Sequence, residues 1–186
     1  IRTELGSDRV AWGMIVVGAL LRLGLPYRLV EMGIGYQLTR LADALSLPRY
    51  GAGTTTLHHL AFQVFGADVS VMVGIHRVLG ILTLPVATAA GVALARAWNL
   101  PASRWLAPLW AGSLALGPLF VRSDLSESNL VPVFFGLWVA LLAWERTRGV
   151  ARWMATLGGL LLVGLSRPEM AVVGPCIWLL LCRPWR

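Results

Sequence analysis

The chain has 186 residues, of which 57% are hydrophobic and only 13% charged, and its formal net charge is +7. Soluble domains carry about a quarter charged residues, so this composition excludes an ordinary water-soluble fold and favours one embedded in lipid. The arginines stand singly at the ends of apolar stretches and not along one polar face, which argues against nucleic acid as a partner.

About six apolar blocks follow one another along the chain, and each predicts a transmembrane helix. They predict an all-α fold, a polytopic transmembrane helix bundle. The last two blocks are shorter than the roughly 20 residues that a span needs, so their boundaries are the least defined. Prolines inside the blocks predict kinked helices. The blocks are Val10–Pro26, Val71–Ala97, Trp105–Val121, Asn129–Trp144, Trp153–Leu165 and Met170–Cys182.

The chain opens on Ile1 and closes on an arginine just past an apolar run, so we expect one domain over 1–186 that is truncated at both ends. Within it, residues 27–70 form the first extracytoplasmic loop and 71–186 hold the remaining spans. Arginines near Arg96, and from Arg146 to Arg152, place those loops in the cytoplasm if the amino terminus is also cytoplasmic. The predicted location is the plasma (inner) membrane, with several passes.

On this topology most of the nine acidic residues share the outer face, which points to that face for chemistry, although exposed loops carry charges in any case. Tryptophans gather at the cytoplasmic ends of the spans, as in an aromatic belt. The outer acids are Glu31, Asp43, Asp68, Asp124, Glu127 and Glu169, and the tryptophans include Trp98, Trp105, Trp144 and Trp153.

The long outer loop has its own helical periodicity. Residues Gly33–Leu47 place apolar side chains at helical spacing and end at Pro48, which predicts an amphipathic interfacial helix. After a Gly-Ala-Gly turn, Thr54–Phe65 repeats the pattern and ends at Gly66. We therefore expect two short helices on the outer membrane surface.

The motif Tyr50-Gly51-Ala52-Gly53, followed by a helix that ends in Phe65-Gly66 and then by Arg77, resembles the GT-C superfamily of membrane glycosyltransferases. That group includes the protein O-mannosyltransferases and the lipid A aminoarabinose transferase. Ser166-Arg167-Pro168-Glu169 is similar to a Thr-Arg-Pro-Glu element of the family, and the run through Asp124 and Glu127 to its acidic second outer loop. The resemblance implies inverting sugar transfer from a polyprenyl-phosphate donor to a lipid, glycan or protein acceptor at the extracytoplasmic face.

The stretch Val30–Tyr36 departs from the family pattern. Family members carry an acidic pair soon after the first span, whereas only Glu31 stands near that place here. Either Glu31 alone removes the proton from the acceptor hydroxyl, or the usual catalytic arrangement is lost. A non-catalytic protein, such as a lipid-linked-sugar transporter or an assembly partner, is therefore the alternative reading.

Arg77 and Arg167 are the candidates for binding the donor phosphate, because guanidinium groups stabilise the charge of the leaving phosphate. The alternative for each is an interfacial arginine that contacts lipid headgroups. Asp124 and Glu127 lie three residues apart and could bind a divalent metal ion as a cofactor or orient the acceptor. The alternative is that both are simply solvated charges of an exposed loop. His76, beside Arg77, suits a phosphate contact, with a capping or interfacial role as the alternative. His58 and His59 point about 100° apart on a helix, so they are not joint ligands of one ion. The candidate substrate contacts are Tyr36, Tyr50, His58, His59, Asp124, Glu127 and Glu169.

Overall fold

The computed structural model describes residues 8–26, 52–118, except 101–104, then 120–121 and 130–182. The described part is helical throughout, which confirms the all-α prediction there. Every predicted apolar block coincides with a helix. The helices are α2 (Arg9–Gly24), α4 (Ala52–Phe65), α5 (Val69–Ala97), α6 (Leu106–Leu116), α8 (Leu130–Arg146), α9 (Gly149–Ser166) and α10 (Met170–Cys182).

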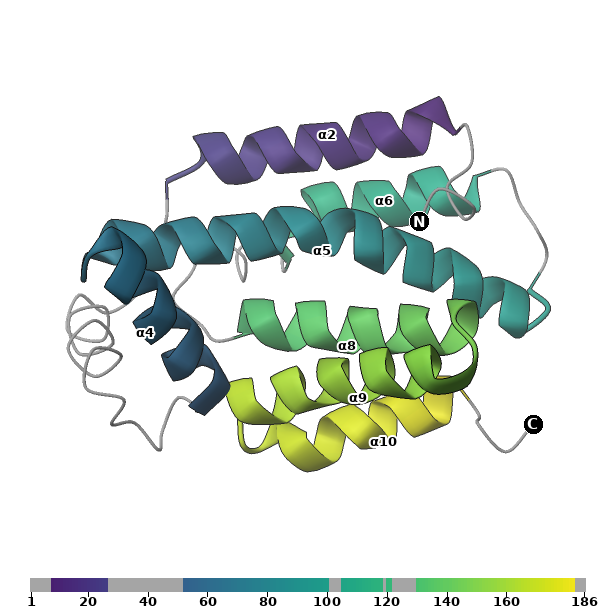
Figure 1. Cartoon of the computed structure of the whole chain (residues 1–186). Coiled ribbons are helices and arrows are strands. Elements are labelled where there is room, and N and C mark those ends of the chain that lie inside the picture. The colour runs from purple at the N-terminus through teal and green to yellow at the C-terminus, as the bar shows by residue number, and fades with distance from the viewer. Residues whose placement is uncertain (1–7, 27–51, 101–104, 119, 122–129, 183–186) are drawn as a thin grey trace.

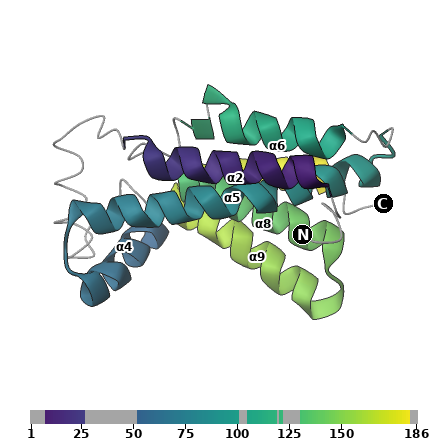
Figure 2. The same ribbon diagram turned by 90° about the horizontal axis from the view of Figure 1, so that it is seen from above.

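Helix α5 is the central element of the fold. It packs against α2 and α6 on one side and against α8 on the other, and α9 and α10 pack in turn beyond α8. Seen from above, the long helices run side by side while α4 crosses near one end (Figure 2). Pro85 lies inside α5 and removes a backbone donor there, and the helix bends near its middle in Figure 1.

Asp8 caps the start of α2: its carboxylate accepts hydrogen bonds from the backbone N–H groups of Val10 and Ala11 at 3.1 and 3.0 Å. This cap satisfies donors that the first helical turn leaves without partners. Further along, Gly18 lets α2 approach α6 and α5 closely, since a Cβ atom there would lie 2.8 Å from the Ala115 Cβ and 2.9 Å from the Leu84 side chain.

The buried Arg22 guanidinium joins the end of α2 to the end of α6. The side chain is 1% exposed, and it donates hydrogen bonds to the carbonyls of Gly18 at 3.1 Å, Leu114 at 3.1 Å and Ala115 at 3.4 Å. The last two carbonyls belong to the final turn of α6, which carries partial negative charge. The cation therefore fixes the carboxyl ends of these neighbouring helices relative to each other.

Among the described residues, two helices, α5 and α9, are long and apolar enough to cross a membrane by length and composition. At 1.5 Å per residue, the 29 residues of α5 extend about 44 Å and the 18 of α9 about 27 Å, against a hydrocarbon layer of about 30 Å. The other helices that coincide with predicted spans are shorter, so a membrane crossing by each of them stays a prediction.

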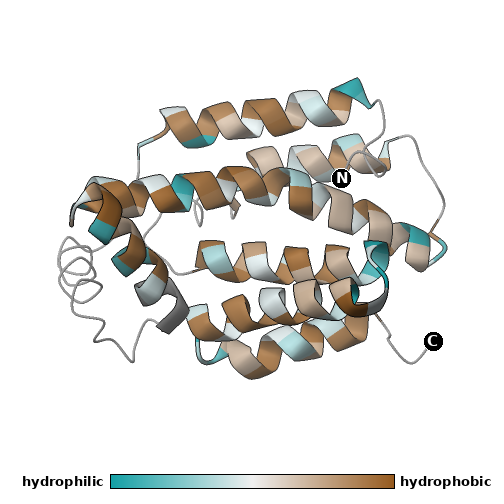
Figure 3. Ribbon diagram, in the orientation of Figure 1, coloured by the Kyte–Doolittle hydropathy of each residue, from teal (hydrophilic) through white to brown (hydrophobic). Residues whose placement is uncertain are grey.

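Hydrophobic residues predominate along the helices (Figure 3), and many large apolar side chains are exposed on the outside of the bundle. Along α9, exposed apolar side chains recur every three or four residues, so one whole face of this helix is apolar. Soluble monomers rarely expose contiguous apolar patches of such extent. The exposed residues of this face are Val150, Met154, Leu157, Leu161 and Leu165, and α2 and α10 expose similar residues, among them Val16, Leu20, Val172 and Leu180.

Tryptophans gather at the end of the bundle away from α4. Trp144 meets Trp153 and Trp178 edge to face, with ring centroids 5.1 and 4.9 Å apart, and the Arg152 guanidinium lies 5.0 Å from the Trp144 ring. The indole N–H of Trp98 donates to the Leu181 carbonyl at 2.8 Å. These contacts tie α8, α9 and α10 together and add an interhelical role to the predicted belt.

Candidate functional site

The α4 end of the bundle is the place where α2 ends, α4 lies across the helices, α5 begins and α9 ends (Figure 1). Helix α4 contacts both α5 and α9. The predicted helix Thr54–Phe65 is confirmed as α4, and Gly66 ends it with a positive φ of 89°. This conformation favours glycine, which explains the sharp turn into α5.

Asp68 caps the start of α5. Its carboxylate accepts a hydrogen bond from the Ser70 backbone N–H at 2.6 Å, and this bond lowers the pKa of Asp68. The Asp68 backbone N–H donates to the Gly66 carbonyl at 3.0 Å. The turn between α4 and α5 is therefore held by backbone and capping bonds, and it fixes where α4 enters the bundle.

Two imidazole rings are buried where α4 meets α5. His58 and His76 are both 0% exposed, their ring centroids are 5.4 Å apart, and Phe62 stacks on His58 at 6.1 Å. Neither ring nitrogen of His58 has a hydrogen-bond partner among the described residues. Burial first, and then the neighbouring His76, lower the pKa of His58 to about 3.

His59 is half-buried and thus differs from its neighbour, as expected for adjacent helical residues. His76, for which the sequence suggested a phosphate contact or a cap, instead lies in the interior against His58.

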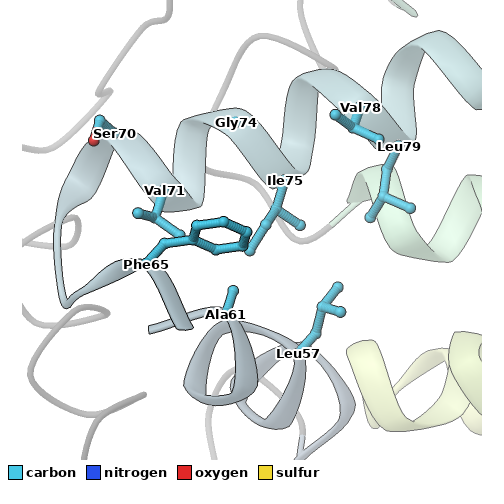
Figure 4. A pocket seen from close by; sticks show the side chains of 9 residues that line it. All are labelled: Leu57, Ala61, Phe65, Ser70, Val71, Gly74, Ile75, Val78 and Leu79. Atoms are coloured by element: carbon cyan, nitrogen blue, oxygen red, sulfur yellow. The ribbon is translucent and has the colours of Figure 1, made fainter. Parts of the chain in front are cut away.

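An open apolar groove of about 520 Å³ runs between α4 and the first turns of α5 (Figure 4). Ser70 supplies the only hydroxyl among its lining residues. Helix α4 contributes Leu57, Ala61 and Phe65, and α5 contributes Val71, Ile75 and Val78. A groove of this lining suits hydrocarbon and offers little to a polar ligand.

The two arginines predicted to bind phosphate both lie at the α4 end, and both already have protein partners. Arg77 donates from a terminal nitrogen to the Leu25 carbonyl at the end of α2, at 2.9 Å. Arg167 follows α9 and forms an ion pair with Glu169, with 2.9 Å between Nε and Oε1. Both members of that pair are exposed to solvent, so the pair is easily exchanged for another anion.

Glu31, Tyr36, Tyr50, Asp124 and Glu127 lie outside the described residues, as does the predicted helix Gly33–Leu47. The role of Glu31 as the base and the acidic second outer loop therefore stay predictions. Of the predicted site residues, the structure brings His58, His59, Arg77, Arg167 and Glu169 to the same end of the bundle.

Sequence reasoning missed the burial of Arg22 and the pairing of His58 with His76. The position of Arg22 near the end of an apolar block was a usable signal. An ionisable residue at such a position either extends to the membrane surface or faces the interior of the bundle, so burial was one of two expected outcomes. Among the described residues, no group of three or more His, Cys, Asp or Glu side chains is placed to hold a metal ion. No protein-family model, curated protein or solved structure matches the chain.

Proposed function

We propose that this chain belongs to a polytopic membrane glycosyltransferase that moves a sugar from a polyprenyl-phosphate donor to an acceptor at the extracytoplasmic face. The observation that carries the proposal is that Arg77, Arg167 and an apolar groove all lie at the α4 end of the bundle. A polyprenyl phosphate has two parts, an anionic head and a hydrocarbon chain, and this end offers a surface suited to each.

Membrane placement is supported by the exposed apolar faces of α2, α9 and α10 and by the length of α5. We propose that the six helices at the predicted blocks cross the bilayer, with α4 at the outer interface. This orientation puts the α4 end outside and the arginines near Arg146 and Arg152 inside, in agreement with the positive-inside rule.

In the proposed reaction, an acceptor hydroxyl attacks the anomeric carbon while its proton passes to the carboxylate of Glu31. The bond between the anomeric carbon and the phosphate oxygen breaks, and its electron pair leaves with polyprenyl phosphate. The configuration at carbon inverts because attack and departure occur on opposite faces of the sugar. Arg77 and Arg167 stabilise the phosphate that leaves, and Arg167 exchanges Glu169 for the phosphate as it does so.

The test uses the full-length protein in nanodiscs with polyprenyl-phosphate donors that carry a labelled hexose or pentose, together with membrane extract as the acceptor source. We expect label to pass to the acceptor, and Glu31→Gln to lower the rate by roughly 10²-fold or more. Glu4→Gln is the matched control at the other predicted face and is expected to keep the wild-type rate. Donor left intact by the wild type favours the non-catalytic alternative, and an unchanged rate in Glu31→Gln rejects the base.

A further inference from the structure

The buried imidazole pair at the junction of α4 and α5 has the properties of a metal site. We propose that His58 and His76 bind one divalent transition-metal ion of the zinc class through their ring nitrogens, with water or another oxygen ligand in the remaining positions. The proposal concerns residues that lie on two separate helices and does not depend on the proposed transferase activity.

The spacing of the rings fits a shared ion. With metal–nitrogen bonds of about 2.0–2.1 Å and a tetrahedral angle, the centroids of two zinc-bound imidazoles lie about 5–6 Å apart. The separation of 5.4 Å between His58 and His76 falls in this range, and the rings are tilted by 41°. His59 points elsewhere, so the pair forms across the helices and not within α4.

Burial supplies the second argument. His58 is fully enclosed, and both of its ring nitrogens lack a hydrogen-bond partner among the described residues. An unsatisfied buried polar group is unfavourable, and a metal–nitrogen bond would remove that cost. Metal ions bind the neutral imidazole, which is the form that burial favours because it lowers the pKa of His58.

A bound ion would fasten α4 to α5. The two helices are otherwise joined by the turn at Gly66 and by the apolar contacts around the groove. Because only His58 is contributed by α4, loss of the ion would free that helix to move while leaving the long helices in place. The site would therefore act as a structural clamp between α4 and α5.

The experiment titrates the full chain, purified in detergent without a histidine tag and stripped with a chelator, with Co²⁺ and with Zn²⁺. We expect one Co²⁺ per chain with the visible absorption of a four-coordinate ion, displaced by Zn²⁺. His58→Ala and His76→Ala are each expected to abolish this signal. His59→Ala is the matched control, adjacent in sequence and of the same residue type, and is expected to keep it.

A ligand exchange keeps the test informative if an alanine variant misfolds. His58→Cys is expected to retain Co²⁺ and to add a thiolate-to-cobalt charge-transfer band, which a merely structural role of His58 would not produce. Helix content and gel-filtration behaviour check the fold of each variant. Absence of Co²⁺ and Zn²⁺ binding by the wild type, or equal binding by folded His58→Ala, overturns the proposal.

Discussion

Arg22 shows how one residue stabilises a helix pair from the interior. The residue is 1% exposed, and its guanidinium donates to two carbonyls of the last turn of α6. Hydrogen bonds to a charged donor are among the stronger ones, and carbonyls left behind in an apolar interior lack any substitute. The residue therefore links the ends of two segments that are far apart in the sequence.

We predict that Arg22→Met lowers the free energy of unfolding by about 2–4 kcal/mol, since it removes these bonds and leaves buried carbonyls unsatisfied. Denaturant titration in micelles, followed by circular dichroism, measures the change. Arg9→Met in the exposed first turn of the same helix is the control and should change stability by no more than about 0.5 kcal/mol. Equal effects of the two variants would contradict a role for the interior bonds.

His58 predicts a dependence of α4 docking on pH. Burial and the neighbouring His76 of α5 lower the pKa of His58 from 6.5 to about 3 in the docked helix. When α4 is undocked, the His58 imidazole takes up a proton once the pH falls below 6.5. When α4 is docked, the same imidazole stays neutral until about pH 3. Docking is therefore fully stable above pH 6.5 and weakens progressively as the pH falls toward 3.

Hydrogen–deuterium exchange in the presence of a chelator checks this prediction. We expect the amides of α4 to lose protection between about pH 7 and pH 5, after correction for intrinsic exchange rates, while α8 keeps its protection. His58→Phe removes the titrating group and should flatten the profile. A profile that keeps its slope in this variant would assign the titration to another residue.

At the scale of elements, a pair of glycines brings the backbones of α8 and α9 into direct contact. A Cβ atom on Gly159 would lie 2.5 Å from the Gly136 carbonyl oxygen, and one on Gly136 would lie 2.6 Å from that of Gly159. The two backbones therefore meet directly, as small residues permit in packed helices. Neither backbone is able to yield as a flexible side chain would.

Gly159→Val is expected to lower the free energy of unfolding by about 1–3 kcal/mol or to separate α8 from α9, because the added carbons meet backbone atoms. Gly158→Val is the matched control, since nothing lies within 4 Å of a Cβ atom at that position. Thermal unfolding of both variants in micelles gives the difference. Similar midpoints would show that the helices have room to shift.

Considered as a whole molecule, the bundle has two chemically different ends. The α4 end holds the buried histidines, the groove and the Arg167–Glu169 pair, and the opposite end holds the tryptophan contacts and Arg152. Antiparallel succession of the helices places every second connection at the same end. A bilayer across this bundle would therefore separate the two ends into different compartments.

Cysteine labelling tests the orientation. In a background with Cys176 and Cys182 replaced by serine, Ala67→Cys lies at the α4 end and Val150→Cys at the opposite end. In intact cells, a membrane-impermeant maleimide should label the cysteine at 67 and should reach that at 150 only after permeabilisation. Labelling with the sides reversed would place the α4 end in the cytosol and would remove the basis for the proposed transfer reaction.

The amino-acid sequence alone determined where the helices lie. The block Val71–Ala97 has no charged residue between Arg77 and Arg96, and Gly66 marks the end of α4 because it accepts the positive φ that the turn requires. These are local properties, so they are readable without the fold. The identities of Arg77, Arg167 and Glu169 as site candidates also came from sequence, while those of Glu31, Tyr36, Tyr50, Asp124 and Glu127 stay predictions.

Only the tertiary structure decided which side chains are enclosed. Periodicity indicated that His58 and His59 differ in direction, but not that His58 would be the buried one or that His76 would meet it from α5. The burial of Arg22 likewise depends on where α6 ends beside α2. The rotation and offset of one helix against another are set by packing across the interface, so the sequence of one helix alone does not specify which of its side chains its partner will cover.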